Sequence, residues 1–330
     1  MLFIIAFQSY AQISDFNHIN FKKADSIALV YNDEELYNLP KLAFQLTSDL
    51  DTEAEQFRAI YRWVCHNISN NYGLYLKNKR NRNRFKTDST KLKTWNDDFR
   101  KTLFKKLLKN KTTICTGYAY LVKELAHLAN LECEIVQGYG RVSTTDIENI
   151  DLPNHSWNAI KLSNKWYLCD PTWASGIPNP KTNRFTFKYN DGFFLAEPEL
   201  FAVNHFPVES KWWLLDENIP TFESFLASPI IYGKAYTNLK RHLAPKQMHQ
   251  TIKKFDTITF KYQLKNTIKS KDISLLINNG SNNRKTKPQS TSIKNKSLTI
   301  KHQFIRSGFY DLHLYFGDDL ISTYTIKVKS

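Results

Sequence analysis

A single cysteine stands where the sequence predicts that a helix begins. Cys115 lies in the segment Thr112-Thr113-Ile114-Cys115-Thr116-Gly117-Tyr118-Ala119, at the start of an amphipathic pattern that runs to Asn130. A thiol at the amino end of a helix lies at the positive end of the helix dipole, which favours the thiolate and lowers the thiol pKa. The backbone amide of the cysteine can donate to an oxyanion, and Gly117 leaves room for a substrate backbone. The pattern therefore predicts a nucleophile.

A histidine and an aspartate lie on the two arms of a predicted β-hairpin. Strands are expected at His155–Leu162 and Trp166–Asp170, with a tight turn at Ser163-Asn164. Alternate residues of a strand share a face, so His155 and Asp170 should project from the same side as diagonal neighbours. An imidazole oriented by a carboxylate beside a thiolate is the arrangement used for acyl transfer.

The register of this hairpin leads to a finer prediction. A two-residue turn pairs Trp157 with Asp170 and His155 with Thr172. Cys169 then points to the opposite face and is expected in the core. Taken singly, the three residues of the triad have plainer explanations, as a buried thiol, a hydrogen-bonded strand histidine and a turn aspartate. Their order along the chain, and the sheet face that His155 and Asp170 share, favour the catalytic interpretation.

The patterns around these residues predict an α+β fold. Thr52 and Glu55 form a capping box, and the apolar residues that follow recur at helical spacing, which predicts a helix at about 53–68. A second helix is expected at about 97–109, before the one that starts at Cys115. Beyond Asn130 the period changes to two, and a further strand is predicted at Glu132–Arg141.

Positive charge is concentrated in two places. Residues 234–330 hold 19 Lys and Arg against 5 Asp and Glu, whereas residues 1–233 hold 27 against 26. Together with alternating apolar segments from about residue 250, this shift predicts a separate basic β-sandwich. Its charge favours an anionic envelope polymer as a binding partner. Nucleic acid is disfavoured, because no RNP motif, zinc-finger spacing or helix-turn-helix pattern accompanies it.

The second place is Lys77–Lys86, which carries six cations in ten residues and is expected to be a solvated loop, with anion binding as the alternative.

The first eleven residues combine a short apolar core with small residues at Ser9 and Ala11. This predicts an export signal cleaved after Ala11, and hence a secreted, periplasmic or cell-surface protein, with a buried first strand as the alternative. No other stretch has the roughly 18 apolar residues of a membrane helix, so no transmembrane segment is expected in the mature chain. The four cysteines and nine histidines lack zinc-site spacing and no acidic cluster suggests a calcium loop, so we expect no metal and no cofactor.

From about Asp49 to Leu215 the sequence resembles the transglutaminase-like superfamily. The resemblance rests on Tyr61-Arg62-Trp63-Val64-Cys65-His66-Asn67-Ile68, Cys115-Thr116-Gly117-Tyr118-Ala119, Gln137-Gly138-Tyr139-Gly140, Asn154-His155-Ser156-Trp157-Asn158 and Trp166-Tyr167-Leu168-Cys169-Asp170-Pro171-Thr172-Trp173. The continuation, Phe193-Phe194-Leu195, Pro198-Glu199, His205-Phe206-Pro207 and Trp212-Trp213-Leu214-Leu215, looks like its kyphoscoliosis peptidase branch.

The resemblance implies a papain-like core and assigns roles to the triad. Cys115 would be the nucleophile, His155 the general base and then acid, and Asp170 the orienting carboxylate. Two positions depart from the family pattern and could alter the substrate groove. Thr113 stands where Gly is usual, and Trp213 stands where Gln is usual.

The resemblance also implies a side-chain oxyanion donor upstream of the cysteine, for which Trp95 is the candidate. Gly117 and Trp157 are further candidates for the substrate groove. For Trp157 the alternative is core packing, which is also expected of Trp63, Trp166 and Trp173.

These observations predict an α+β transglutaminase-like core with helices on an antiparallel sheet, followed by an all-β immunoglobulin-like sandwich. The predicted segments are an export signal at 1–11, an arm at 12–48, the catalytic domain at 49–217, a linker at 218–249 and the basic sandwich at 250–330. The predicted function is acyl transfer on protein or peptide amides through a thioester, with hydrolysis slightly favoured over cross-linking. The alternative is a catalytically silent secreted scaffold held on an anionic envelope surface.

Overall fold

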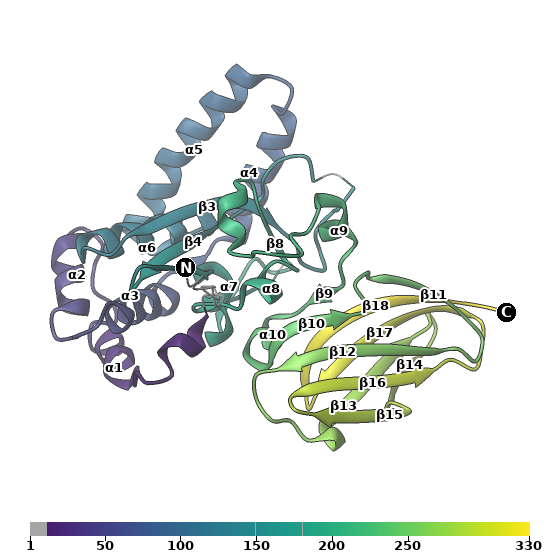
Figure 1. Cartoon of the computed structure of the whole chain (residues 1–330). Coiled ribbons are helices and arrows are strands. Elements are labelled where there is room, and N and C mark those ends of the chain that lie inside the picture. The colour runs from purple at the N-terminus through teal and green to yellow at the C-terminus, as the bar shows by residue number, and fades with distance from the viewer. Residues whose placement is uncertain (1–11, 149, 180) are drawn as a thin grey trace, which may run out of the picture.

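The computed structural model describes residues 12–148, 150–179 and 181–330. A group of helices is followed along the chain by a four-stranded antiparallel sheet and then by two larger sheets (Figure 1). The predicted export signal, Met1 to Ala11, lies outside the described residues. Within those residues, no helix is both long enough and apolar enough to span a bilayer.

A group of helices precedes α6, the helix that begins at Cys115, and several of them pack against it. The capping box predicted from the sequence starts α3, where Thr52 Oγ1 accepts from the N–H of Glu55 at 3.2 Å and donates to Glu55 Oε2 at 2.7 Å. The helices are η1 (Ile13–Phe16), α1 (Lys22–Val30), α2 (Leu39–Thr47), α3 (Glu53–Asn67), α4 (Tyr72–Arg84), α5 (Ser89–Asn110) and α6 (Cys115–Leu128).

The segment Lys77–Lys86 is not the loop that its charge pattern predicts, because most of it belongs to helix α4. Asn71 caps this helix, with Oδ1 accepting from the N–H of Leu74 at 2.9 Å. Lys and Arg are good helix formers, and Leu74 is buried against Phe99 and Leu103 of α5. Together α4 and α5 form a hairpin that projects from the body (Figure 1). Helix α5 also begins earlier than expected, because Asp88 caps it.

The central sheet has the strand order β5-β4-β3-β8, with all neighbours antiparallel. Its strands are β3 (Cys133–Gly140), β4 (His155–Leu162), β5 (Lys165–Cys169) and β8 (His205–Pro207). The register predicted for the hairpin is confirmed up to the pair Asn158 and Cys169.

Beyond Cys169 the prediction is wrong. Pro171 has no N–H for a strand ladder and suits the first turn of a helix. Strand β5 therefore ends, and Asp170 becomes the N-cap of helix α7 (Pro171–Ser175). Thr172 lies in that helix instead of pairing with His155.

Short elements lie between these helices and strands and in the segment that leads to the carboxyl-terminal sheets. They are β1 (Ser69–Asn70) and β2 (Thr112–Thr113), which pair in parallel, β6 (Gly176–Pro178) and β7 (Phe185–Phe187), which pair antiparallel, and η2 (Asp191–Phe193), α8 (Pro198–Phe201), η3 (Ser210–Trp213) and α9 (Phe222–Ala227).

Two sheets face each other in the carboxyl-terminal region and share one apolar core. One has the order β10-β12-β16-β15, and the other has the order β11-β18-β17-β13-β14 with β9 paired to β18. Across the sandwich, the rings of Phe260 and Tyr324 are 4.8 Å apart, and the hydroxyls of Tyr262 and Tyr324 are hydrogen-bonded at 2.8 Å. The elements are β9 (Ile230–Ile231), α10 (Gly233–Asn238), β10 (Leu239–Ala244), β11 (His249–Lys253), β12 (Thr257–Leu264), η4 (Ser270–Asp272), β13 (Ile273–Asn278), β14 (Asn283–Thr286), β15 (Ser290–Lys294), β16 (Ser297–Gln303), β17 (Gly308–Phe316) and β18 (Asp319–Lys329).

The segment 218–249, which the sequence predicts as a linker, is largely folded. It contains α9, β9, α10 and β10, and both of its strands hydrogen-bond into the sandwich. The same segment joins the sandwich to the core. Arg141 Nη2 donates to the carbonyl of Pro229 at 2.8 Å, Asn204 Nδ2 donates to that of Ile231 at 2.8 Å, and the rings of Phe193 and Tyr236 are 4.3 Å apart.

Gly138 allows β3 to approach its neighbours closely. A Cβ added there would lie 2.3 Å from the carbonyl oxygen of Phe206 and 2.4 Å from the Trp157 ring. We expect Gly138→Ala to lower the free energy of unfolding by about 3 kcal/mol, because the strand and the indole must both move. Urea unfolding measures this loss.

Gly73→Ala is the matched control. A Cβ there meets only Asn71 Oδ1, at 3.7 Å, so this change should alter stability by less than about 1 kcal/mol. Equal effects of the two substitutions would contradict the close approach at Gly138.

Candidate active site

Cys115 is the first residue of helix α6 and lines a cleft of about 730 Å³. Its N-cap, Ile114, supplies no side-chain hydrogen bond. The first hydrogen-bonded amide of the helix is that of Gly117, which donates to the carbonyl of Ile114. Among the hydrogen bonds of the described residues, none uses the N–H of Cys115 or Thr116. These two amides at the positive end of the helix remain available to an oxyanion in the cleft.

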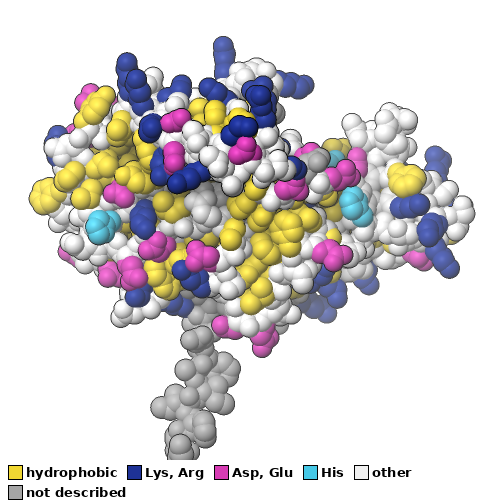
Figure 2. All heavy atoms as spheres, turned by 90° about the horizontal axis from the view of Figure 1, so that it is seen from above, with side chains coloured by type: hydrophobic (Ala, Val, Ile, Leu, Met, Phe, Trp, Pro, Cys, Tyr) yellow, Lys and Arg dark blue, Asp and Glu magenta, His cyan; other side chains and the backbone are white. Residues whose placement is uncertain are grey.

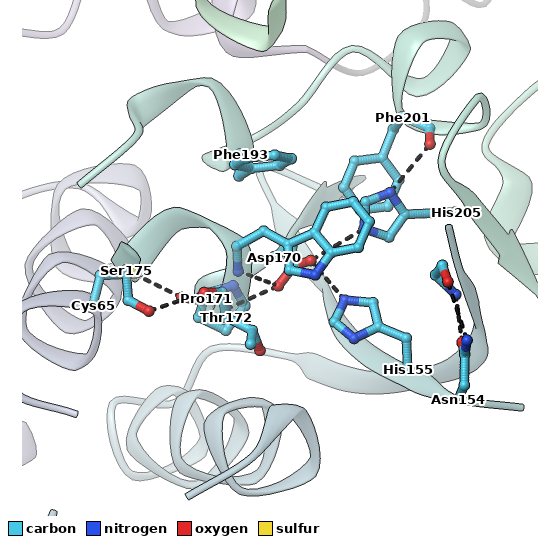
Figure 3. A network of polar contacts seen from close by, with 12 residues as sticks. Cys65, Asn154, His155, Asp170, Pro171, Thr172, Ser175, Phe193, Phe201 and His205 are labelled. Atoms are coloured by element: carbon cyan, nitrogen blue, oxygen red, sulfur yellow. Dashed lines mark hydrogen bonds and ion pairs between the residues drawn. The ribbon is translucent and has the colours of Figure 1, made fainter. Parts of the chain in front are cut away.

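Asp170 is fully buried, and both of its carboxylate oxygens are hydrogen-bonded. Oδ1 accepts from the N–H groups of Thr172 and Trp173 at 2.9 and 3.1 Å. Oδ2 lies 2.7 Å from His155 Nε2 and 3.1 Å from His205 Nε2. Figure 3 shows the carboxylate between the two imidazole rings. Burial acts to raise the pKa of Asp170, but the charge of His155 and the bonds from both histidines outweigh it and hold that pKa well below its usual range.

His155 lies at the start of β4, beside both Asp170 and Cys115. Burial acts to lower the pKa of its imidazole. The charge and hydrogen bond of Asp170, with a smaller contribution from Cys115, raise it from 6.5 to about 10. Because Nε2 faces Asp170, the other nitrogen, Nδ1, is left for the thiol. The ring stacks on Trp173 with centroids 5.0 Å apart, and a Cβ at Gly140 would lie 2.9 Å from it.

The environment of Cys115 favours its thiolate form. The residue is only 8% exposed, and burial alone would raise the pKa of the thiol. The hydrogen bond and charge of His155, with the backbone N–H of Ser156, more than compensate, so the pKa of Cys115 is lowered. The other three thiols, Cys65, Cys133 and Cys169, are buried without an imidazole partner, and burial raises the pKa of each. All four cysteines are free.

His205 belongs to the site, although sequence reasoning gave it no role. Its ring stacks on Phe201 with centroids 3.6 Å apart, and its Nδ1 lies 3.2 Å from the Phe201 carbonyl oxygen. Burial lowers the pKa of His205 to about 4, which keeps the ring neutral. Its single N–H is assigned to Nε2, because the anionic Asp170 is the stronger acceptor. Only the pairing of β8 with β3 brings His205 here, so no local pattern could have found it.

The remaining predicted site residues lie apart from the thiol. Trp95 is on α5, where its Nε1 donates to Asn78 Oδ1 of α4 at 3.0 Å, and it is not among the described residues that line the cleft. Trp157 is fully buried beneath His205, with ring centroids 5.1 Å apart. A Cβ at Gly117 would lie 1.9 Å from Thr113 Oγ1. The space beside Gly117 is therefore filled by Thr113, one of the two residues that depart from the family pattern.

Trp213, the second residue that departs from the family pattern, and the remaining tryptophans take part in packing. Trp213 is buried and contacts Phe206, with ring centroids 4.8 Å apart. Trp63 is fully buried, while Trp166 and Trp173 are partly buried. Of these residues, Trp173 is the one that lines the cleft.

Among the described residues, the possible metal-ligating atoms of His155, Asp170 and His205 lie within 4.8 Å of one another, as a metal site would require. The separations of 2.7 and 3.1 Å between their nitrogens and Asp170 Oδ2 are hydrogen-bond distances. The arrangement is thus already satisfied as a hydrogen-bond network, in which each histidine donates to the carboxylate.

Comparison with known proteins assigns part of the chain to a family. A model of the transglutaminase-like superfamily matches residues 40–171. This segment is a transglutaminase-like domain. The resemblance found in the sequence is thus confirmed, and so is the prediction of a transglutaminase-like core that combines helices with an antiparallel sheet.

The transglutaminase-like domain has relatives in several animals. Human kyphoscoliosis peptidase is 33% identical over 180 residues, which cover 54% of this chain and 24% of the relative. Hillarin of Drosophila melanogaster is 26% identical over 227 residues, covering 64% of this chain and 25% of the relative. The Lim and transglutaminase domain protein ltd-1 of Caenorhabditis elegans is 23% identical over 208 residues, covering 59% of this chain and 26% of the relative. The chain thus spans about a quarter of the length of the relatives it matches.

The pair of His155 and Asp170 makes the stability of this domain depend on pH. The pKa of His155 is raised from 6.5 to about 10, so its contribution is complete below about pH 6.5 and is lost as the pH rises towards 10. The pKa of Asp170 is lowered from 3.8, so its contribution is present above that value and is lost in stronger acid.

We expect the difference in unfolding free energy between the wild type and Asp170→Asn to be largest near pH 5.5. It should shrink by about 2 kcal/mol or more by pH 9.5, because the unfolded chains have released the His155 proton by then, whereas the folded wild type, with a His155 pKa of about 10, still holds it. Urea unfolding at the two pH values measures the change. Asp151→Asn, which removes a surface partner of Lys86, is the control and should show a small difference at both. A pH-independent difference for Asp170→Asn would contradict the ion pair.

Proposed function

We propose that the protein is a cysteine-dependent enzyme of acyl transfer that acts on protein or peptide amides. Cys115 is the nucleophile, His155 the general base and then acid, and Asp170 the orienting carboxylate. One observation carries the proposal. The lowered pKa of Cys115 depends on His155, whose opposite nitrogen is held by a fully buried carboxylate.

The proposed reaction begins with the thiolate of Cys115, whose proton is held by His155. Sulfur attacks the carbonyl carbon of the amide, and the developing oxyanion accepts from the N–H groups of Cys115 and Thr116 at the start of α6. The C–N bond then breaks as His155 gives its proton to the departing amine, which leaves a thioester on Cys115.

An acceptor completes the reaction by attacking the thioester. His155 takes a proton from the acceptor, the acyl group leaves the sulfur, and the thiolate returns. With water the outcome is hydrolysis, and with an amine it is cross-linking. We propose hydrolysis as the main outcome.

Two further features of the chain remain proposals. We propose an immunoglobulin-like type for the sandwich, supported by its two packed, mainly antiparallel sheets. We also propose that the protein is exported and held on an anionic envelope surface. This is supported by the 19 Lys and Arg against 5 Asp and Glu in residues 234–330.

Alkylation by iodoacetamide tests the active-site proposal. At pH 6.5 we expect Cys115 to react at least about tenfold faster than an exposed model thiol, because its thiolate is populated. Peptide mapping by mass spectrometry compares it with Cys65, Cys133 and Cys169, which serve as internal controls. His155→Ala should remove the selectivity for Cys115. Slow and unselective labelling of all four thiols would favour the silent scaffold instead.

A further inference from the structure

Helix α4 forms one wall of the cleft that contains Cys115. Tyr75, Lys79 and Arg82 of this helix line the cleft together with the thiol. They are spaced at i, i+4 and i+7, which places them on one face of the helix. Helix α4 contains no Asp or Glu. Seen from the side of the α4–α5 hairpin, the surface carries groups of Lys and Arg, with Asp, Glu and apolar side chains between them (Figure 2).

The two cations on this wall are available to a ligand. Arg82 Nη1 donates to the carbonyl of Pro153 at 2.7 Å, and this is its one hydrogen bond among the described residues. Its remaining N–H donors are free for a carboxylate, which a guanidinium binds with two parallel bonds. Lys79 is exposed and forms no ion pair within the described part of the chain.

Arg82 also lies close enough to the thiol for their charges to interact. Burial lowers the pKa of the guanidinium, and the negative charge on Cys115 opposes that shift. A guanidinium remains charged at neutral pH in either case. A group bound by Arg82 would therefore lie near the amide that Cys115 attacks.

The positive charge is balanced elsewhere in the cleft. At the sandwich end, Asp318 of the β17–β18 turn and Asp319 at the start of β18 line the cleft together with Lys234. Lys234 Nζ lies 3.9 Å from Asp319 Oδ1. Charges of both signs thus meet at that end. Asp146 of the β3–β4 loop also lines the cleft. Lys79 and Arg82 face the cleft from a helix without acidic residues.

We propose that the cleft selects polypeptides with acidic side chains beside the amide that reacts, and that Arg82 and Lys79 of α4 bind those carboxylates. The proposal rests on the function proposed for Cys115 and names its substrate class. The occupant is a peptide because the nucleophile beside these cations is suited to an amide. A carboxylate near Arg82 would lie on the α4 side of the thiol.

Two alkylating reagents of similar size test the charge at the thiol. Iodoacetate is anionic and iodoacetamide is neutral. The rate of Cys115 with iodoacetate divided by its rate with iodoacetamide, relative to the same ratio for an uncharged cysteine derivative, therefore reports the electrostatic potential at the thiol. We expect Arg82→Gln to lower this ratio by about two- to five-fold, as removal of one partly buried charge would. Lys79→Glu changes the charge by two units at an exposed position and should lower the ratio by at least as much. Lys105→Glu, an exposed change on α5 with the same change in charge as Lys79→Glu, should leave it unaltered. In 0.5 M NaCl the change in the rate ratio caused by the two α4 substitutions should shrink.

Protection by peptides tests the ligand class. A decapeptide rich in Glu should slow the reaction of Cys115 with iodoacetamide at least about three-fold more than the same peptide with Gln at those positions. Lys79→Glu should abolish the difference. Equal protection by the two peptides, or a Glu preference that survives both α4 substitutions, would overturn the proposal. Protection by a non-peptide polyanion as strong as that by the Glu peptide would also overturn it.

These outcomes separate the two proposals. If Cys115 reacts no faster than the other three cysteines, the proposed function fails. If Cys115 reacts selectively but shows no preference for anions, the acyl-transfer proposal stands and the acidic substrate class fails. Lys79 is exposed, so its variant keeps the test valid even if Arg82→Gln disturbs the contact with Pro153.

Discussion

The buried carboxylate of Asp170 is the constraint on which the rest of the site depends. A charge taken out of water costs several kcal/mol unless it is paired and hydrogen-bonded. Here four donors meet that need: the amides of Thr172 and Trp173, and the rings of His155 and His205. These donors come from helix α7 and strands β4 and β8. Satisfying one carboxylate therefore fixes the relative positions of three elements, and the position of His155 beside Cys115 follows from them.

Packing around the carboxylate keeps water away from it. Trp173 covers one face of His155, Phe201 stacks on His205, and Trp157 is buried beneath both histidines. The aromatic layer fits because β3 has glycine at the positions that face it, Gly138 against Trp157 and Gly140 against His155. In such a dry environment the interaction between His155 and Asp170 is stronger than it would be in water. The high pKa of the imidazole and the lowered pKa of the thiol both follow.

The cleft is built by segments that are far apart in the chain. Its walls come from α4, the β3–β4 loop, the start of α6 and the turn between β17 and β18. The carboxyl-terminal sandwich is thus part of the cleft as well as a neighbouring structure. It is attached through Arg141, Asn204 and the contact of Phe193 with Tyr236. Access to Cys115 therefore depends on contacts between the two halves of the molecule.

Features set by local interactions were readable from the sequence, and features set by distant contacts were not. The capping box at Thr52, the hairpin turn at Ser163-Asn164 and the helix that begins at Cys115 each depend on a few neighbouring residues, and the structure has all three. Asp170 and Pro171 show the limit, because the alternation that predicted a strand gave no weight to a proline that starts a helix. At Lys77–Lys86 the charge pattern suggested a loop, but Leu74 packs on α5 and makes a helix stable. The strands in 218–249 and the role of His205 arise from pairing with partners far along the chain. Residue types and spacing thus identified the chemistry of Cys115, His155 and Asp170, while burial, long-range strand pairing and packing between elements decided which other residues meet them.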